Sequence, residues 1–326
     1  MALPPILQNL RLPLIGAPLF IISRPELVIA QCKAGIVGTF PALNAREKDG
    51  ESLDAWLTHI KEELDRHNQA NPDNPAAPFG INQIVHRSNE RLERDVELAV
   101  KHEVPVWITS LGARTEVFDA AHSVGGVVLH DIINDTFAKK AISKGADGLI
   151  AVAAGAGGHA GALSPLALIQ EIRAWFDGPL YLSGSIARGD AILAALAMGA
   201  DGGYAGSAFI ATQEANAVEG YKQMIADCGA DDIVYSNLFT GVLGNYLKPS
   251  IANAGLDPDN LPVSDPTKMN FAEDREKPKS WTEIWGSGQG IGAIKDVVST
   301  AERVDTLAAQ FDAAKARLAA EVAKYG

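Results

Sequence analysis

Eight short apolar runs alternate with longer amphipathic segments up to about residue 212, and this alternation constrains the fold more than any other feature. The apolar runs are predicted strands at residues 12–18, 36–41, 79–85, 104–111, 124–132, 147–154, 178–185 and 201–209. The predicted helices between them cover residues 24–35, 52–69, 88–102, 114–122, 135–144, 165–176 and 189–198. Strands that are apolar on both faces and separated by helices indicate a parallel sheet covered on both sides.

Eight such units predict an α/β protein with a closed (β/α)₈ TIM barrel. An open, doubly wound sheet is the alternative, but the first strand is not followed by the Gly-x-Gly-x-x-Gly turn typical of dinucleotide-binding members of that class. Ser52 and Ser88 precede two of the amphipathic segments and are predicted N-caps, and Pro25 suits the first turn of another helix.

The pattern changes after residue 212. Residues 213–228 have helical periodicity, whereas 229–290 are rich in Pro, Asn, Asp and Gly. Because long structureless loops are uncommon in compact domains, we expect a small helical insertion or lid there. From Ile294 onward, apolar residues recur every three or four positions and predict a terminal helix packed on the barrel. The expected domains are a barrel (1–212 plus 291–326) and a small substrate-capping domain (213–290).

The composition excludes several classes of protein. A net charge of −12 on 326 residues argues against a nucleic-acid-binding role, which needs a basic face. No apolar stretch is long enough to span a bilayer, and prolines interrupt the N-terminal apolar run, which lacks the basic start of a signal peptide. The two cysteines, Cys32 and Cys228, have neither disulfide-framework nor metal-site spacing. We therefore expect a cytoplasmic protein without a metal; the sequence leaves a homodimer open.

Polar and small residues cluster where the predicted strands end. The active site of a barrel lies at the carboxyl ends of its strands. Five residues fall at these ends in the first, third and fifth strands: Ala17, Pro18, Asn82, His130 and Asp131. His130 and Asp131 are second-rank candidates for the pocket.

Two consecutive strands, the seventh and eighth, each end in a Gly-Ser pair followed by a helical segment. These pairs are Gly184-Ser185 and Gly206-Ser207. Barrels commonly bind phosphate at the loops after these two strands, through backbone N–H groups that glycine leaves accessible. The sequence therefore predicts a phosphate-binding site there.

The sixth strand leads into "GAGGHAG", in which His159 is the single titratable residue among small neighbours that include Gly158. A lone histidine is more often structural than catalytic. Here it follows a strand end, and the glycines leave space for a flat ligand beside it. A side chain with an ordinary pKa of about 6.5 can exchange a proton at neutral pH, so His159 is the predicted catalytic residue.

Together these residues resemble the nitronate monooxygenase family, also called 2-nitropropane dioxygenase-like flavoproteins. Related flavin-dependent enoyl-acyl-carrier-protein reductases share much of the pattern. The most specific match is "DGLIAVAAGAGGHAG", and "LPLIGAP", "GIN", "LSGSIARGDAILAALAMGADGGYAGSAFIAT" and "GSGQG" are also similar. The resemblance covers the barrel from about Leu12 to Thr212 and returns at residues 285–294.

The resemblance implies non-covalent FMN at the barrel mouth, with its phosphate on the two Gly-Ser loops. Ala17, Pro18 and Asn82 would line the isoalloxazine ring, and the second domain would complete the site through Ser287, Gly288 and Gln289. His159 corresponds to the histidine above the flavin, which takes the α-proton of a nitroalkane or binds the nitronate. The implied reaction oxidises a nitronate with O₂ and yields a carbonyl compound and nitrite.

Two departures from the family pattern concern the pocket. Leu19 stands where relatives usually carry Met, and Asp131 stands where some place a lysine. Two other readings stay open: an NAD(P)H-dependent reductase of quinones or enoyl thioesters on the same scaffold, and a flavin-free barrel that binds a phosphate ligand.

Overall fold

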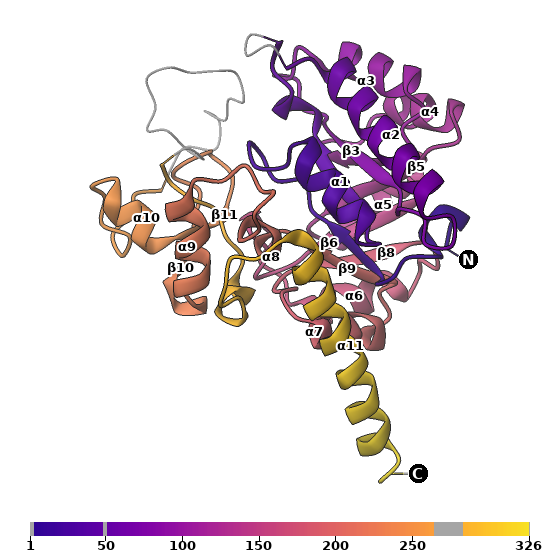
Figure 1. The fold of residues 1–326 in the computed structure, drawn as a ribbon. Coiled ribbons are helices and arrows are strands. Elements are labelled where there is room, and N and C mark those ends of the chain that lie inside the picture. Colours follow the sequence, from indigo (N-terminus) through magenta and orange to yellow (C-terminus); the bar gives the residue numbers. More distant parts are fainter. Residues whose placement is uncertain (1–2, 48–50, 264–282, 326) are drawn as a thin grey trace.

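The computed structural model describes residues 3–47, 51–263 and 283–325. Eight parallel strands form one sheet in the order β1-β9-β8-β6-β5-β4-β3-β2. The Ile15–Val37 bridge closes this sheet into a barrel, because Gly16 N–H donates to Val37 O at 2.8 Å. The strands are β1 Leu14–Gly16, β2 Gly38–Pro41, β3 Phe79–Ile84, β4 Val106–Ser110, β5 Val127–Ile132, β6 Gly148–Val152, β8 Leu180–Ser183 and β9 Gly202–Ala205. The predicted TIM barrel is confirmed (Figure 1).

Helices surround the barrel and shield its outer face from water. They are α1 Pro25–Lys33, α2 Leu53–Ala70, α3 Leu92–Lys101, α4 Thr115–Ser123, α5 Asp135–Ser143, α6 Pro165–Arg173, α7 Gly189–Met198 and α8 Ser207–Ile210. Inside the barrel, side chains such as Ile15, Val106 and Tyr181 are fully buried and fill the lumen. The lumen is therefore a packed core, and ligands are restricted to the barrel's ends.

The C-terminal helix α11 (Thr300–Val322) packs on α7, as predicted, and its last turns project beyond the barrel (Figure 1). The contact is close at Gly189, where a Cβ would lie 2.2 Å from Leu307 O. Gly189 N–H also donates to Gln310 Oε1 at 3.0 Å. Glycine is thus required where the two helices meet.

Three helix starts differ from the predictions. Ser88 is not an N-cap: α3 begins at Leu92, and the Ser88 hydroxyl instead lies 2.8 Å from His86 Nδ1. The helix expected from residue 213 begins at Glu219, and the terminal helix begins at Thr300 with Ser299 as its cap. Of these three starts, only that of the terminal helix has a side-chain cap, in which the Ser299 hydroxyl accepts from Glu302 N–H. The predicted cap Ser52 is confirmed, since its hydroxyl accepts from Ala55 N–H.

The segment after β9 contains strands that the sequence did not predict. Strands β10 (Ile233–Ser236) and β11 (Gly244–Leu247) form an antiparallel hairpin, flanked by α9 (Glu219–Asp227) and α10 (Lys248–Asn253). β11 also pairs with β7 (Gly158–His159), a two-residue strand outside the barrel. The expectation of a helical insertion was therefore only partly right. Residues 264–282 lie outside the described residues, and the two-domain division stays a prediction.

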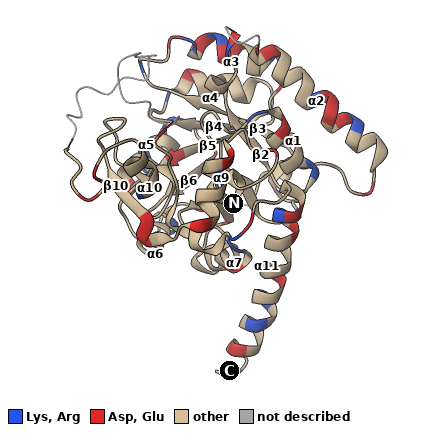
Figure 2. Ribbon diagram, turned by 60° about the vertical axis from the view of Figure 1, so that its left-hand side comes forward, with Lys and Arg blue, Asp and Glu red and all other residues tan. Residues whose placement is uncertain are grey.

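Acidic and basic residues are interspersed along α2, α3 and the projecting end of α11 (Figure 2). Within residues 3–47, 51–263 and 283–325, no helix is both long and apolar enough to cross a membrane.

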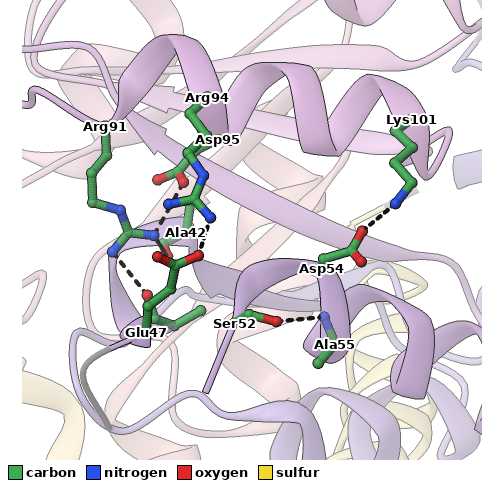
Figure 3. A network of polar contacts seen from close by, with 10 residues as sticks. Ala42, Glu47, Ser52, Asp54, Ala55, Arg91, Arg94, Asp95 and Lys101 are labelled. Atoms are coloured by element: carbon green, nitrogen blue, oxygen red, sulfur yellow. Dashed lines mark hydrogen bonds and ion pairs between the residues drawn. The ribbon is translucent and has the colours of Figure 1, made fainter. Parts of the chain in front are cut away.

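Arg91 ties the segment after β2 to the start of α3 (Figure 3). Its guanidinium donates to Ala42 O and Ala45 O and pairs with Asp95, which is 1% exposed. The adjacent Arg94–Glu47 pair is exposed on both sides. Arg91 therefore fixes residues 42–45, which include the cavity-lining Leu43 described below.

We expect Arg91→Gln to lower the free energy of unfolding by about 3 kcal/mol, because it leaves the Asp95 carboxylate buried and unpaired. Arg94→Gln is the matched control, and it should change stability little because solvent already screens its ion pair. Chemical denaturation of both variants measures the difference, and equal losses would contradict the structural role given to Arg91.

Candidate active site

A cavity of about 1000 Å³ opens at the carboxyl ends of the barrel strands and is covered partly by the β10–β11 hairpin. It brings together residues from all eight barrel strands or the loops after them, from the hairpin and from the segment after the hairpin. Of the sequence-predicted site residues, the following line it: Ala17, Pro18, Asn82, His130, Asp131, Gly158, His159, Gly184, Ser185, Gly206, Ser207 and Gly288.

Ser287 and Gln289, also predicted as cofactor-binding, do not line the cavity. Ser287 is buried behind it, with its hydroxyl 3.4 Å from Ser207 Oγ. Gln289 N–H donates to Gly155 O at 2.9 Å. The structure therefore places both residues where they support the wall and not on its surface.

His159 is held at the cavity wall by strand pairing. Its backbone lies opposite Gly244 of β11, and its Nε2 lies 2.9 Å from Thr240 Oγ1. Gly158, with φ of +63°, makes the turn before it. Burial lowers the pKa of the imidazole to about 4. The side chain is therefore neutral at pH 7 and can accept a proton.

The loop around His159 is fixed on both sides. Asn245 Nδ2 donates to Ala156 O at 2.7 Å, and the Tyr235 hydroxyl donates to Ala160 O at 2.7 Å. Both anchors come from the hairpin. His159 therefore has a defined position although it lies in a glycine-rich loop.

Three polar side chains form a hydrogen-bonded row at the ends of β3, β4 and β5. Asn82 Nδ2 donates to Ser110 Oγ at 2.8 Å, and Ser110 Oγ donates to Asp131 Oδ2 at 2.6 Å. Asp131 Oδ1 is buried with no hydrogen-bond partner. Burial raises the pKa of Asp131 to about 7, and the Ser110 hydrogen bond opposes this only partly.

His130 lies beside this row and is also buried. Its Nδ1 is 2.6 Å from Thr109 Oγ1, and burial lowers the pKa of its imidazole to about 4. A neutral imidazole already bonded to a threonine is suited to positioning neighbours in the wall.

The two Gly-Ser loops follow β8 and β9 and lie at the same cavity. Gly184 and Ser185 both have positive φ values, +141° and +56°. Such a conformation is unusual for serine and turns the backbone sharply at the strand end. Ser207 Oγ accepts from Gly288 N–H at 2.9 Å, which joins the β9 loop to the later segment.

Several wall residues were missed by the sequence analysis. Thr240, Tyr235 and Asn245 belong to the hairpin, which the sequence did not reveal, and Ser110 is the polar end of β4. The position of Ser110 at a strand end, like that of Asn82, is the signal that could have found it. Across the described residues, no cluster of three or more His, Cys, Asp and Glu side chains could hold a metal ion.

Comparison with known proteins agrees with the barrel fold and identifies a family. The family model described as nitronate monooxygenase matches residues 7–310. A dehydrogenase of (3aS,4S,5R,7aS)-5-hydroxy-7a-methyl-1-oxo-octahydro-1H-indene-4-carboxyl-CoA from Rhodococcus jostii is 26% identical over 233 residues, which are 72% of this chain but only 62% of the relative. A nitronate monooxygenase of Neurospora crassa is 26% identical over 325 residues, 87% of this chain and 84% of the relative.

A nitroalkane oxidase from Streptomyces ansochromogenes has the same fold, with a TM-score of 0.76 and 22% sequence identity. The match covers 95% of this chain and 98% of that one. This likeness shows a shared barrel fold. The chain belongs to the nitronate monooxygenase family, as the sequence predicted.

Asp131 makes stability depend on pH. Its pKa in the fold, about 7, lies above its ordinary value of 3.8, so its contribution to stability is present below pH 4 and is lost as the pH rises to 7. Asp131→Asn should therefore raise the melting temperature more at pH 8 than at pH 4.5. Thermal unfolding measures this, with the exposed Asp119→Asn as control; an equal change at both pH values would contradict the assignment.

Proposed function

We propose that this protein is an FMN-dependent enzyme that oxidises alkyl nitronates, and nitroalkanes after deprotonation, with O₂ to a carbonyl compound and nitrite. The observation that carries the proposal is His159, neutral and fixed at the wall of a cavity that also contains both Gly-Ser loops. Family membership and the Neurospora relative support the nitronate as substrate.

The glycines of the cavity support a flat, phosphate-bearing cofactor. A Cβ on Gly157 would lie 2.7 Å from Gly288 N, and one on Gly155 would lie 2.4 Å from Ser185 Oγ. Gly157 therefore packs directly on the backbone of Gly288, and Gly155 packs on the side chain of Ser185. Because neither glycine has a side chain, a ligand in the cavity can come close to both loops. The phosphate would be held by the hydroxyls of Ser185 and Ser207 and by other backbone N–H groups of the two loops, since Ser185 N–H already donates to Gly155 O at 3.2 Å.

The polar row fits the rest of the cofactor. Asn82 and Asp131 offer an amide and a carboxyl at the strand ends, and the unpaired Asp131 Oδ1 needs a donor such as a hydroxyl. A protonated Asp131 would avoid repulsion from the phosphate. When bound, FMN supplies the electron acceptor for the substrate and the reductant for O₂.

His159 has a defined role in this proposal. Thr240 Oγ1 donates to Val242 O at 3.1 Å and can therefore accept from His159 Nε2. In this arrangement the imidazole hydrogen would lie on Nε2, and Nδ1 would be the basic nitrogen. His159 would then remove the α-proton of a nitroalkane, and as a neutral donor it would orient a nitronate without a charge of its own.

A reductase or dehydrogenase is the second candidate function, because one curated relative is named as a dehydrogenase of a CoA ester. It would use the same cofactor site but take its electrons from NADH or NADPH. The two candidates differ in the compound that reduces the flavin.

We also propose a cytoplasmic enzyme that works on small molecules and O₂ without nucleic-acid or membrane partners. Cys32 and Cys228 are both free and buried, as expected in a reducing compartment. A homodimer stays open.

The glycine cradle predicts a specific loss of cofactor affinity. Gly157→Ala should weaken FMN binding at least tenfold, because the methyl group forces the Gly288 backbone away from the wall. Gly220→Ala is the matched control, since a Cβ there meets only Trp285 at 3.6 Å. Fluorescence titration of FMN with flavin-free protein measures both; unchanged affinity of the Gly157 variant would rule out this cradle.

Anaerobic stopped-flow spectroscopy tests the function itself. A nitronate such as propionate 3-nitronate should bleach the flavin quickly, whereas NADH should not. Reduction by NADH alone would support the second candidate and reject the first.

The same instrument tests His159. In His159→Asn, reduction by neutral nitroethane should fall about 100-fold, the ordinary scale of general-base catalysis, and reduction by its preformed nitronate much less. Because the base is neutral above its pKa of about 4, wild-type activity on nitroethane should be lost only as the pH falls toward 4. The exposed His122→Asn is the control. If the rate of flavin reduction falls equally with nitroethane and with its nitronate, His159 orients the substrate and does not act as the base.

A further inference from the structure

We propose that the substrate is an elongated amphiphile: an apolar chain that runs from His159 to the outer mouth of the cavity and ends in an anionic group at Lys140. This inference rests on the proposed function, since it takes the reacting end to lie at His159. It goes further by naming the chemistry of the part of the substrate that does not react.

The mouth of the cavity is lined by large apolar side chains that are unusually exposed. We call them the apolar mouth, and each is between 39% and 47% exposed: Ile133, Phe137, Tyr235 and Leu243. They come from the β5–α5 segment, from α5 itself and from the hairpin. Contiguous exposed apolar surface on a protein usually marks a binding site.

The loop that follows His159 connects these side chains. Ala160 N–H donates to Leu243 O at 3.2 Å, and Ala160 O accepts from the Tyr235 hydroxyl. On the other side, a Cβ on Gly161 would lie 3.2 Å from Ile133 Cβ. The apolar mouth is therefore continuous with the wall that carries His159.

The apolar mouth and the cofactor loops occupy different sectors of the barrel. The Gly-Ser loops follow β8 and β9, whereas Ile133 and Phe137 follow β5. The cavity of about 1000 Å³ is at the upper end of the range for ligand sites, and it extends past the cofactor loops as far as the apolar mouth. A long chain would cover the side chains that a short substrate leaves exposed.

Charge indicates what the far end of that chain carries. Among the described residues that line the cavity, Lys140 has the only lysine or arginine side chain. It lies one turn after Phe137 on α5, so both face the mouth. The acidic Asp131 instead lies on the barrel side, bonded to Ser110. An anionic group at the mouth, such as a carboxylate, fits this arrangement.

Lys139 provides a matched control on the same helix. Its ammonium lies 2.6 Å from Asp135 Oδ2 and 5.6 Å from the centre of the Trp175 ring, and it does not line the cavity. Substitution of either lysine removes one positive charge from α5. Only the substitution at Lys140 removes the charge from the cavity.

The first test uses calorimetric titration of the FMN-loaded protein with decanoate and butyrate. Each buried methylene contributes about fourfold in affinity, so decanoate should bind at least tenfold more tightly than butyrate. Lys140→Gln should weaken decanoate binding at least fivefold, and Lys139→Gln should leave it unchanged. Equal affinities for the two acids, or equal effects of the two variants, would overturn the inference.

The second test compares nitronates of two to ten carbons, with and without a terminal carboxylate, as reductants of the flavin. We expect kcat/KM to rise with chain length and further with the carboxylate. A flat profile in an enzyme that oxidises the short nitronates would overturn this inference and leave the proposed function intact. If no nitronate reacts but decanoate binds as expected, the proposed function fails and the amphiphile site stands.

A third measurement asks whether the apolar mouth contacts a protein instead. Phe137→Ser should weaken decanoate binding without changing the molecular mass in solution, and the exposed Val218→Ser away from the cavity should change neither. A change of mass in the Phe137 variant, with decanoate affinity preserved, would identify a protein interface and overturn the proposal.

Discussion

The pairing of β11 with its two neighbours is the interaction on which the site depends. Asn245 is central to it: its side-chain amide holds Ala156 O, and its backbone carbonyl accepts from Ser287 N–H at 3.1 Å. The same strand fixes the backbone of His159 through Gly244. A single buried strand thus sets the distance between the histidine loop, from the sixth barrel unit, and the segment near Gly288, which is more than 100 residues later in the chain.

Close backbone packing is the second constraint. Gly157 and Gly288 lie so near each other that neither tolerates a side chain, and Gly206 is close to Leu19. The wall is therefore mainly main chain at the Gly-Ser and histidine loops, whereas side chains form the polar row at the ends of β3, β4 and β5 and the apolar mouth. The difference matters chemically, because main-chain N–H groups can hold a phosphate without lysine or arginine, in agreement with an acidic protein.

Much of the barrel and part of the site could be predicted from the sequence, because both follow from local pattern. Strand ends are visible as the point where an apolar run meets Asn82, His130 or a Gly-Ser pair, and barrel closure brings these ends together. The hairpin could not be found in this way. Its strands have four residues each and are held by β7 and by buried aromatic contacts such as Phe239 with Tyr246, which depend on the tertiary fold. Ser88 failed as a cap for a similar reason, since a neighbouring histidine took its hydroxyl.

The contact between α7 and α11 connects the C-terminal helix to the loop that is proposed to bind the phosphate, although the helix itself lies outside the cavity. Gly189, where α7 starts, is only four residues after Ser185, and it lies directly against the α11 backbone at Leu307. The loop proposed to carry the phosphate is thus buttressed from behind by a helix 121 positions away in sequence. A change of position of residues 307–310 would therefore shift the start of α7 and the loop before it. The projecting end of α11 has no such contact with the loop (Figure 1).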